Sequence, residues 1–412
     1  MSGEHGEPFD VLIAGGGPVG ACAGALLARG GAGALKVGIL EPRRPVAPAR
    51  DAAVDLRVSA FSRASERILR SAGAWQAIES CRVSPYERMR VWHERERPEG
   101  SGVLVFDAAD AGEPNLGHII ENRLVQASLL DAFEAAGGSL IGAEARDVTV
   151  REARVEVATG DGPLSTRLLV GADGARSLVR ERIGLTVEAR SYEQTAIVAA
   201  VATERPHERT AWQRFLATGT LAFLPLADGL SSIVWSADAA AAATLLSAGA
   251  EEFGEALTRA ADRALGGVRL ASERLSFPLH SLAAHRYAAE RIALVGDAAH
   301  VVHPLAGQGV NLGLLDAAAL AELVLAARAE REDAGAQRVL RQYERWRRSE
   351  TALMATAIEL FNRFLAHGSD PLARLAQRGL AWVNRSTEVK RFFMARALGT
   401  SGHLPRAALD AG

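Results

Sequence analysis

The first forty residues combine two short apolar runs with a segment of helical spacing. Phe9 to Ala14 and Lys36 to Glu41 have strand length, and Pro18 to Arg29 between them repeats its apolar residues with a helical period. A glycine cluster separates the first run from the helical segment. This pattern predicts a β-α-β unit with two parallel strands.

The rest of the first half keeps the mixture of helix and strand. Amphipathic spacing predicts helices over Ser62 to Ala72 and Asn122 to Ala136. Ala153 to Ala158 and Thr166 to Val170 are apolar runs bounded by Gly and Asp, which predicts strands. This half of the chain is therefore expected to be α/β.

From about Arg190 to His280 the period changes to strand-like alternation. Such alternation is typical of antiparallel sheets with one face on a core. A helical stretch around Glu251 to Leu265 interrupts it, and the Ala-rich run Ala239 to Leu246 predicts a surface helix. We expect an inserted, mostly antiparallel sheet with strands over Ala196 to Ala202, Thr220 to Leu226, Ser231 to Ser236 and Val268 to Phe277.

The pattern then returns to α/β. Arg291 to Val295 predicts a buried strand, Val310 to Ala327 a long helix, and the chain beyond Gln337 is helical in pattern to its end. The expected fold class is α/β, or α+β overall. A Rossmann-like nucleotide-binding domain takes residues 1–75, 119–184 and 281–336, a substrate domain 76–118 and 185–280, and a C-terminal helical region 337–412.

Composition narrows the function classes. The 412 residues include 48% hydrophobic and 23% charged residues with a net charge of -2, which argues against a nucleic-acid binder. Cys22 and Cys81 are too few for a disulfide framework, and no Cys/His cluster has metal-ligand spacing. The polar N-terminus predicts no signal peptide, and no apolar run predicts a bilayer span. We expect a cytoplasmic protein with at most peripheral contact to the inner membrane.

The glycine cluster after the first strand has dinucleotide-binding spacing. Gly15, Gly17 and Gly20 form G-x-G-x-x-G where a strand turns into a helix, so the backbone can approach a pyrophosphate at the helix N-terminus. Glu41, 21 residues after Gly20, ends the second strand where an acid would bind an adenosine ribose. A glycine turn without a ligand is the alternative, but strand, helix and acid in register favour dinucleotide binding.

A second cluster of small residues, Gly171 to Ser177, follows a predicted strand. Asp173 in this cluster can cap the helix that begins near Arg176. Capping alone would explain the residue, but the neighbouring Arg176 and Arg180 favour a role near the nucleotide.

A third cluster suits a flavin. Asp297 ends a predicted strand, where its carboxylate can hold a ribityl hydroxyl. The Gly-rich turn from Gly307 to Gly313 opens a helix and presents free N–H groups to a flavin pyrimidine ring. His300 and His303 have no further metal ligand nearby, so we expect no metal.

These clusters, in this order and spacing, resemble the group A aromatic flavin monooxygenases with the para-hydroxybenzoate hydroxylase fold. The stretch His303 to Asp316, HPLAGQGVNLGLLD, is similar without a mismatch to the signature of the ubiquinone-biosynthesis FAD-dependent hydroxylases. Leu56 to Ala60, Leu116 to Asn122 and Lys390 to Gly399 also resemble that family, so the similarity covers nearly the whole chain. Within the family the chain most resembles the 2-polyprenylphenol hydroxylases.

The resemblance implies roles for individual residues. Gly15, Gly17, Gly20 and Glu41 would hold the ADP half of FAD, and Asp297 the ribityl-pyrophosphate region. The remaining assignments place Arg57 and Asn122 along the phosphates and flavin edge, Asp173 in a motif for both FAD and the pyridine nucleotide, Pro304 against the isoalloxazine, and the amides of Gly309, Val310 and Asn311 at its N1/O2 edge.

The implied reaction is ring hydroxylation of a polyprenylated phenol with NAD(P)H and O₂, C5 preferred. Tyr192 and His280 are candidates for deprotonating the phenol, although packed side chains would explain both. A small acidic substrate would need a buried Arg beside the flavin. Arg214 is the one candidate, and we expect it to be exposed. The inserted sheet offers a substrate wall of apolar residues, namely Leu221, Phe223, Leu224, Ile233 and Trp235.

Other functions remain open at this stage. They are a hydroxylase of a small phenol, a flavin-dependent reductase or halogenase, and a non-catalytic FAD-binding member of a ubiquinone-synthesis assembly. The halogenase motif W-x-W-x-I-P is absent from the sequence. The C-terminal segment from Arg341 is basic and aromatic, so it could rest on lipid or a partner, but core packing explains it better.

Overall fold

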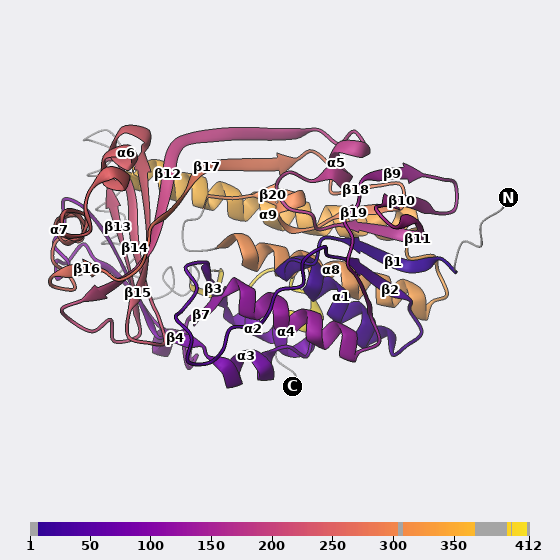
Figure 1. The fold of residues 1–412 in the computed structure, drawn as a ribbon, viewed down its shortest axis with the longest axis horizontal. Coiled ribbons are helices and arrows are strands. Elements are labelled where there is room, and N and C mark those ends of the chain that lie inside the picture. Colours follow the sequence, from indigo (N-terminus) through magenta and orange to yellow (C-terminus); the bar gives the residue numbers. More distant parts are fainter. Residues whose placement is uncertain (1–6, 304–307, 367–393, 397, 410–412) are drawn as a thin grey trace.

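The computed structural model describes residues 7–303, 308–366, 394–396 and 398–409. Its two large sheets lie at opposite ends of the long axis (Figure 1). The predicted β-α-β unit is present: β1 (Phe9–Ala14) pairs in parallel with β2 (Val37–Leu40), and α1 (Pro18–Gly31) connects them. The glycine cluster occupies the turn between β1 and α1.

An eight-stranded sheet surrounds this unit in the order β18-β19-β11-β1-β2-β8, with β10 and β9 continuing from β11. Strands β1, β11 and β19 are parallel, so their carboxyl ends meet at one edge of the sheet. That edge brings the three predicted ligand clusters together. The added strands are β8 (Ser139–Ile141), β9 (Asp147–Val150), β10 (Val155–Thr159), β11 (Gly162–Gly171), β18 (Ala288–Ala289) and β19 (Ile292–Leu294).

Helices α4 (Asn122–Ala135) and α8 (Gln308–Ala329) pack against α1 beside this sheet, and α5 (Leu178–Arg182) follows β11. Helix α8 is long and apolar enough for a bilayer span, contrary to our expectation that no segment would be. However, 67% of its most apolar window is buried inside the protein. Its small residues, such as Gly313 and Ala317, allow the close packing with α1.

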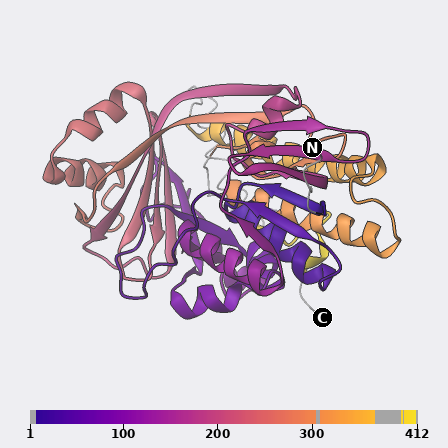
Figure 2. The ribbon, with the colours of Figure 1, turned by 45° about the vertical axis from the view of Figure 1, so that its right-hand side comes forward.

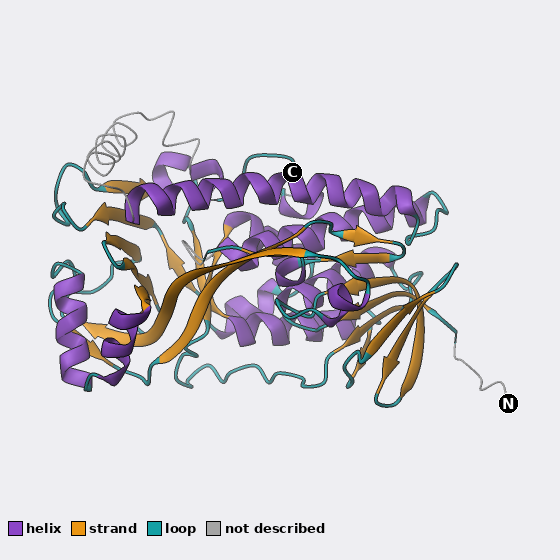
Figure 3. Ribbon diagram, turned by 90° about the horizontal axis from the view of Figure 1, so that it is seen from above, coloured by secondary structure: helices purple, strands orange, loops and turns teal. Residues whose placement is uncertain are grey.

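A nine-stranded sheet fills the other end of the molecule, with helices α6 (Ala239–Ser247) and α7 (Ala250–Ala260) on its outer face (Figure 2). Its long strands β12 and β17 run back toward the first sheet (Figure 3). The strands are β5 (Arg88–His93), β6 (Leu104–Asp107), β12 (Val187–Thr203), β13 (Thr210–Leu216), β14 (Gly219–Pro225), β15 (Ser231–Asp238), β16 (Val268–Leu270), β17 (Leu275–Ala284) and β20 (His300–Val301).

A three-stranded sheet of β3, β7 and β4 completes the described architecture. Residue Asn122 follows β7 directly, so this sheet positions the start of α4. The elements are β3 (Val58–Ser62), α2 (Arg63–Ser71), α3 (Trp75–Cys81), β4 (Ser84–Tyr86), the 3-10 helix η1 (Ala108–Ala111) and β7 (Gly117–Glu121).

Two predictions of local structure were wrong, and several strands were not predicted. The strand expected over Val268 to Phe277 is two strands, because the chain leaves β12 at Ser272, whose hydroxyl accepts from the Ala200 amide at 2.8 Å. Strands β5, β6 and β13 are among those that the sequence pattern did not predict. Helix α9 (Gln337–Ala366) confirms the start of the predicted C-terminal helical region, but residues 398–409 are not a continuous helix: Gly399 and Gly402 have φ of +67° and +101°, and the 3-10 helix η4 (Arg406–Ala408) lies beyond them.

Candidate flavin and substrate site

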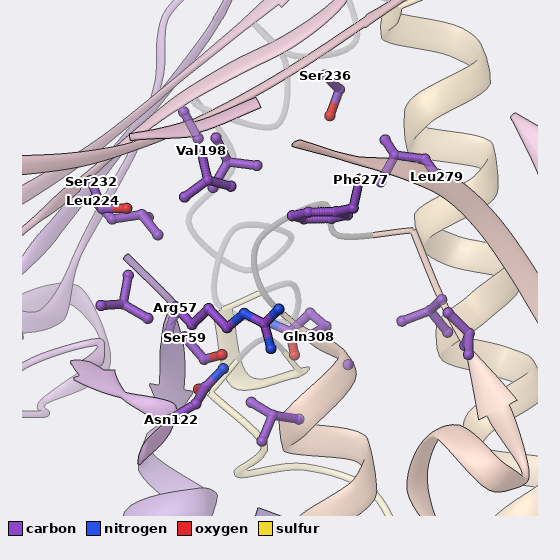
Figure 4. Close-up of a pocket in the computed structure, with 18 of the residues that line it drawn as sticks. Arg57, Ser59, Asn122, Val198, Leu224, Ser232, Ser236, Phe277, Leu279 and Gln308 are labelled. Atoms are coloured by element: carbon purple, nitrogen blue, oxygen red, sulfur yellow. The ribbon is translucent and has the colours of Figure 1, made fainter. Parts of the chain in front are cut away.

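A cavity of about 820 Å³ lies between the carboxyl edge of the first sheet and the inner face of the nine-stranded sheet (Figure 4). The N-terminal ends of α1 and α8 both reach it, through Gly17, Pro18 and Gln308, Gly309. Neither helix has an acidic residue in its first turn. Two helix N-termini without neutralising side chains favour an anionic ligand or ligand portion in this cavity.

The fold requires two of the three glycines in the first motif, whereas the third leaves space for a ligand. A Cβ at Gly20 would lie 2.0 Å from the Gly15 carbonyl oxygen, and one at Gly15 would lie 2.4 Å from the Ala172 oxygen. Both are therefore required by the fold. Gly17 has an ordinary φ of -61°, and a Cβ there would meet no atom within 4 Å, although Gly17 lines the cavity. Its missing side chain leaves room for a ligand, as the pyrophosphate interpretation requires.

Glu41 lies beside this glycine loop at the end of β2. Its carboxylate accepts the Gly16 amide at 3.0 Å and the Arg43 amide at 3.1 Å. The acid is therefore fixed next to the turn that approaches the cavity. Its predicted contact with a ribose stays a prediction.

Asp297 lies in the 3-10 helix η2 (Gly296–Ala298), which directly follows the parallel strand β19, and its side chain is exposed to the cavity. Desolvation by the surrounding protein raises the pKa of Asp297, and the nearby His300 and His280 oppose that shift. Its carboxylate can accept hydrogen bonds from ligand hydroxyls. This placement suits the ribityl role that the resemblance implies.

Arg57 and Asn122 also line the cavity, and Figure 4 shows both side chains pointing toward Gln308. The Asn122 Oδ1 atom is buried and has no hydrogen-bond partner within the described chain. A buried acceptor without a partner is costly, so it favours a bound donor at this wall. The N3 and O4 edge of a flavin carries one such donor.

The start of α8 brings only part of its predicted set to the cavity. Gly309 and Val310 line it, and a Cβ at Gly309 would meet no atom within 4 Å. Asn311 does not line it, and the predicted role of its backbone amide stays a prediction; its side chain turns toward β3, where it accepts from the Ser62 amide at 2.9 Å and donates to the Ala60 carbonyl at 2.8 Å. Asn311 thus joins α8 to β3. Pro304 lies outside the described residues.

Asp173 does not line the cavity, although its neighbours Ala172 and Gly174 do. The N-cap residue of α5 is Ser177, whose hydroxyl accepts the Arg180 amide at 3.0 Å, and one carboxylate oxygen of Asp173 accepts the neighbouring Val179 amide at 3.0 Å. Asp173 therefore supports the first turn of α5 without being its N-cap. Its Oδ1 atom is buried and has no partner within the described chain. Arg180 is nearly buried and donates to the Ala298 and Ala175 carbonyls instead of forming a close ion pair with Asp173.

The inner face of the nine-stranded sheet forms the opposite wall of the cavity. Most of the apolar residues that we predicted for this wall lie on the other face of the sheet. Side chains alternate between the two faces of a strand. Thr220, Ala222 and Leu224 of β14 therefore face the cavity. The apolar residues between and beside them pack on the outer face against α7, so only Leu224 of the predicted wall lines the cavity: Leu221, Phe223, Ile233 and Trp235 do not.

Of the three residues predicted as candidates for contacting the substrate, only His280 lines the cavity. Arg214 is 8% exposed, so the expectation of an exposed Arg was wrong, but it points away from the cavity and donates to the Ala260 and Glu94 carbonyls. Tyr192 donates to Glu359 of α9 at 3.1 Å and does not line the cavity. His280 does line it. In the described part of the chain, no group of three His, Cys, Asp or Glu side chains converges on a metal position.

The sequence did not reveal two features of the site. Three polar residues of the sheet wall, Gln213, Thr220 and Ser236, line the cavity. A buried pair of His300 and Asp316 supports the turn before Asp297. Alternation along β14 would have placed Thr220 correctly, whereas the pairing of His300 with Asp316 depends on the packing of α8.

The cavity fits FAD by three independent observations: two open glycines at helix starts, a carboxylate at a strand end, and the unpartnered Asn122 acceptor. Residues 8–357 match the FAD binding domain family. The ubiquinone hydroxylase UbiL of Rhodospirillum rubrum is 36% identical over 97% of this chain and 92% of its own. The 3-demethoxyubiquinol 3-hydroxylase of Escherichia coli is 33% identical over 95% and 99%.

Solved structures show the same fold. The p-nitrophenol 4-monooxygenase PnpA of Pseudomonas putida superposes with a TM-score of 0.74 at 21% identity, over 95% of this chain and 98% of that one. PqsL of P. aeruginosa, in complex with 2-aminobenzoylacetate, gives 0.72 at 25% identity, over 92% and 100%. The family match and the sequence relatives together identify the chain as a member of the FAD binding domain family, among the FAD-dependent monooxygenases that include the ubiquinone-biosynthesis hydroxylases.

Proposed function

We propose that this protein hydroxylates the aromatic ring of a polyprenylated phenol in ubiquinone biosynthesis, with C5 as the preferred position. The observation that carries the proposal is the single cavity shared by the flavin-side residues and a wall of small and apolar side chains. The relatives named for ubiquinone hydroxylation support this substrate class. The preference for C5 rests on the sequence resemblance alone.

When bound, FAD reduced by NAD(P)H activates O₂ and supplies the oxygen atom. The chain's own residues bind and orient. The helix N-terminus at Gly17 would hold the pyrophosphate, Asp297 would accept hydrogen bonds from ribityl hydroxyls, and the amides at the start of α8 would stabilise negative charge on the reduced flavin. The apolar wall around Leu224 and Val234 excludes water and holds the ring close to the flavin.

The shape of the sheet wall favours a bulky neutral substrate over a small acid. Its cavity-facing residues include Val198, Ala222, Leu224 and Val234, which leave space and carry no charge. Arg214, the candidate that the sequence offered for gripping a substrate carboxylate, points to α7, and Arg57, which does line the cavity, lies on the flavin side opposite this wall. An unpaired carboxylate against this wall would be costly.

We also propose that the protein works in the cytoplasm at the surface of the inner membrane, within an assembly of ubiquinone-synthesis proteins. The support is chemical, since a polyprenylated substrate resides in lipid. Fractionation of cells that carry a tagged chain should recover it with membranes in low salt, together with partner proteins. Recovery of all of the chain in the soluble fraction without partners contradicts this part of the proposal.

The central experiment is a lipid profile of a strain that lacks the gene. Accumulation of a prenylated phenol lacking one ring oxygen, reversed by the wild-type gene, supports the proposed reaction, and the position of the missing oxygen tests the C5 preference. Purified protein should oxidise NAD(P)H and oxygenate that phenol. Normal ubiquinone in the deletion strain, together with lost growth on a hydroxybenzoate, favours the small-phenol alternative.

A further inference from the structure

The cavity wall contains a short row of polar side chains that nothing in the described chain satisfies. Gln213, Thr220 and Ser236 line the cavity and are 5%, 7% and 1% exposed. Their side chains form no hydrogen bond with any described residue, so they are available to a ligand in the cavity. We call these three residues the polar row.

The strand register makes the polar row contiguous. Thr220 of β14 and Ser236 of β15 are direct cross-strand partners. Gln213 of β13 pairs with Ala222, two residues along β14 on the same face as Thr220. Such neighbours lie within roughly 5–8 Å of each other, so one small group can contact several of them. The flanking cavity residues Ala222 and Val234 are apolar, so the row is a local polar site on this wall.

We propose that the polar row binds the phenolic oxygen of the substrate and so orients the ring over the flavin. This inference rests on the proposed function. A hydroxyl group and a primary amide can each donate and accept, which matches a phenol that donates its O–H and accepts at oxygen. The row carries no charge, so it favours a neutral phenol over a carboxylate. The residues position the ring through its oxygen.

The structure also separates the polar row from two other serines of β15. Ser232 lines the cavity beside Leu224, but it lies four residues from Ser236, roughly 13 Å along the strand, so it belongs to another part of the wall. Ser231 faces away from the cavity. It lies on the same strand and is 0% exposed with a buried hydroxyl that has no partner in the described chain, so Ser231→Ala is a control that removes a hydroxyl outside the cavity.

The test titrates FAD-loaded protein with 2-geranylphenol and with geranylbenzene, which lacks only the oxygen, and follows the flavin absorption spectrum. Wild type should bind the phenol more tightly by about tenfold for each hydrogen bond formed. The double variant Thr220→Val/Ser236→Ala should lose this preference because it binds 2-geranylphenol more weakly, while its affinity for geranylbenzene stays unchanged. Thr220→Ser and Ser231→Ala should keep it. FAD content and melting temperature show whether each variant is folded.

The possible outcomes separate this inference from the proposed function. If the double variant keeps the wild-type preference for 2-geranylphenol over geranylbenzene, the polar row does not bind the phenolic oxygen. The same conclusion follows if wild type binds both probes equally. Hydroxylation of 2-geranylphenol by that wild type would still uphold the proposed reaction. A wild type that binds neither probe overturns the proposed substrate class and the row with it. If the double variant does not fold, Gln213→Met gives the same comparison.

Discussion

The Nε2 atom of His300 lies 2.6 Å from Oδ2 of Asp316, and both side chains are buried. The same oxygen accepts the Gly296 amide at 3.1 Å, and Oδ1 accepts from Arg347 at 2.7 Å. Gly296 directly precedes Asp297. This buried network therefore ties the turn that carries the predicted ribityl ligand to helices α8 and α9.

Removing the central carboxylate should destabilise the protein strongly. Asp316→Ala leaves the 1%-exposed Arg347 without its anion, and breaking a buried ion pair in this way costs about 3–5 kcal/mol. Urea unfolding should show this loss. The matched control is Asp131→Ala, which removes an exposed partner of Arg44 and should cost at most about 1 kcal/mol. Equal losses in the two variants would show that the buried network contributes little.

The same network predicts a dependence of stability on acid pH. Burial alone raises the pKa of Asp316, but the charges of His300 and Arg347 outweigh it and hold the pKa below its usual value. A carboxyl with a lowered folded pKa stabilises above its unfolded pKa, about 3.9, and loses that contribution as pH falls through its folded pKa. The free energy of unfolding should therefore decrease as the pH is lowered below about 4. Asp316→Asn should show a shallower fall, and an identical pH profile would assign the acid sensitivity to other carboxyls.

Sequence patterns predicted the parts of the fold that local spacing determines. β1, α1 and the glycine turn appear where expected because a strand, a glycine cluster and a helix follow one another directly. The sequence also allowed the prediction that Gly17 and Asp297 lie in the same cavity, since each follows a strand of one parallel set. The resemblance supplied the cofactor and substrate class, which no spacing alone could give.

Long-range packing decided what the sequence missed. Leu221 and Leu224 look alike in a list of apolar residues, but they occupy opposite faces of β14, and only the position of α7 shows which face is core. The position of the Asn311 side chain depends on β3, because it forms hydrogen bonds with Ser62 and Ala60, which precede it by 249 and 251 residues in the sequence. Arg214 is buried because β13, which was not predicted, lies beside α7.

The two glycines at the start of α1 should respond differently to substitution. Gly17→Val should leave the flavin-free fold within about 1 kcal/mol of wild type, because its Cβ meets no protein atom, but it should abolish FAD binding. Gly20→Ala forces a Cβ to 2.0 Å from the Gly15 oxygen and should destabilise the flavin-free fold by about 1–3 kcal/mol or more. Flavin absorbance and urea unfolding measure the two effects. Full FAD occupancy in Gly17→Val would remove the pyrophosphate from this turn.

Asp297 gives a prediction for cofactor affinity. Asp297→Ala should weaken FAD binding by about 1.5–3 kcal/mol, the usual contribution of a hydrogen bond to a charged group. Titration of the flavin-free protein with FAD, followed by flavin fluorescence, measures the change. Asp228→Ala, on an exposed turn of the substrate sheet, is the control and should bind FAD as wild type does. An unchanged dissociation constant for Asp297→Ala would leave Asp297 a structural role only.

The two faces of β14 make the sharpest prediction about the substrate wall, because neighbouring residues should give opposite results with the same new side chain. Ala222 faces the cavity and Leu221 packs against α7. Ala222→Phe adds a ring where the wall is hollow, so substrate affinity should fall while FAD content and stability stay close to wild type.

Leu221→Phe overfills a core whose members are almost fully buried, so it should cost about 1–3 kcal/mol of stability and leave substrate binding unchanged. Titration with 2-geranylphenol, together with urea unfolding, measures both properties in each variant. The reversed result, in which Leu221→Phe blocks the substrate and Ala222→Phe only destabilises, would move the substrate to the outer face of the sheet. That face carries α6 and α7, so the proposed cavity would then have to be abandoned.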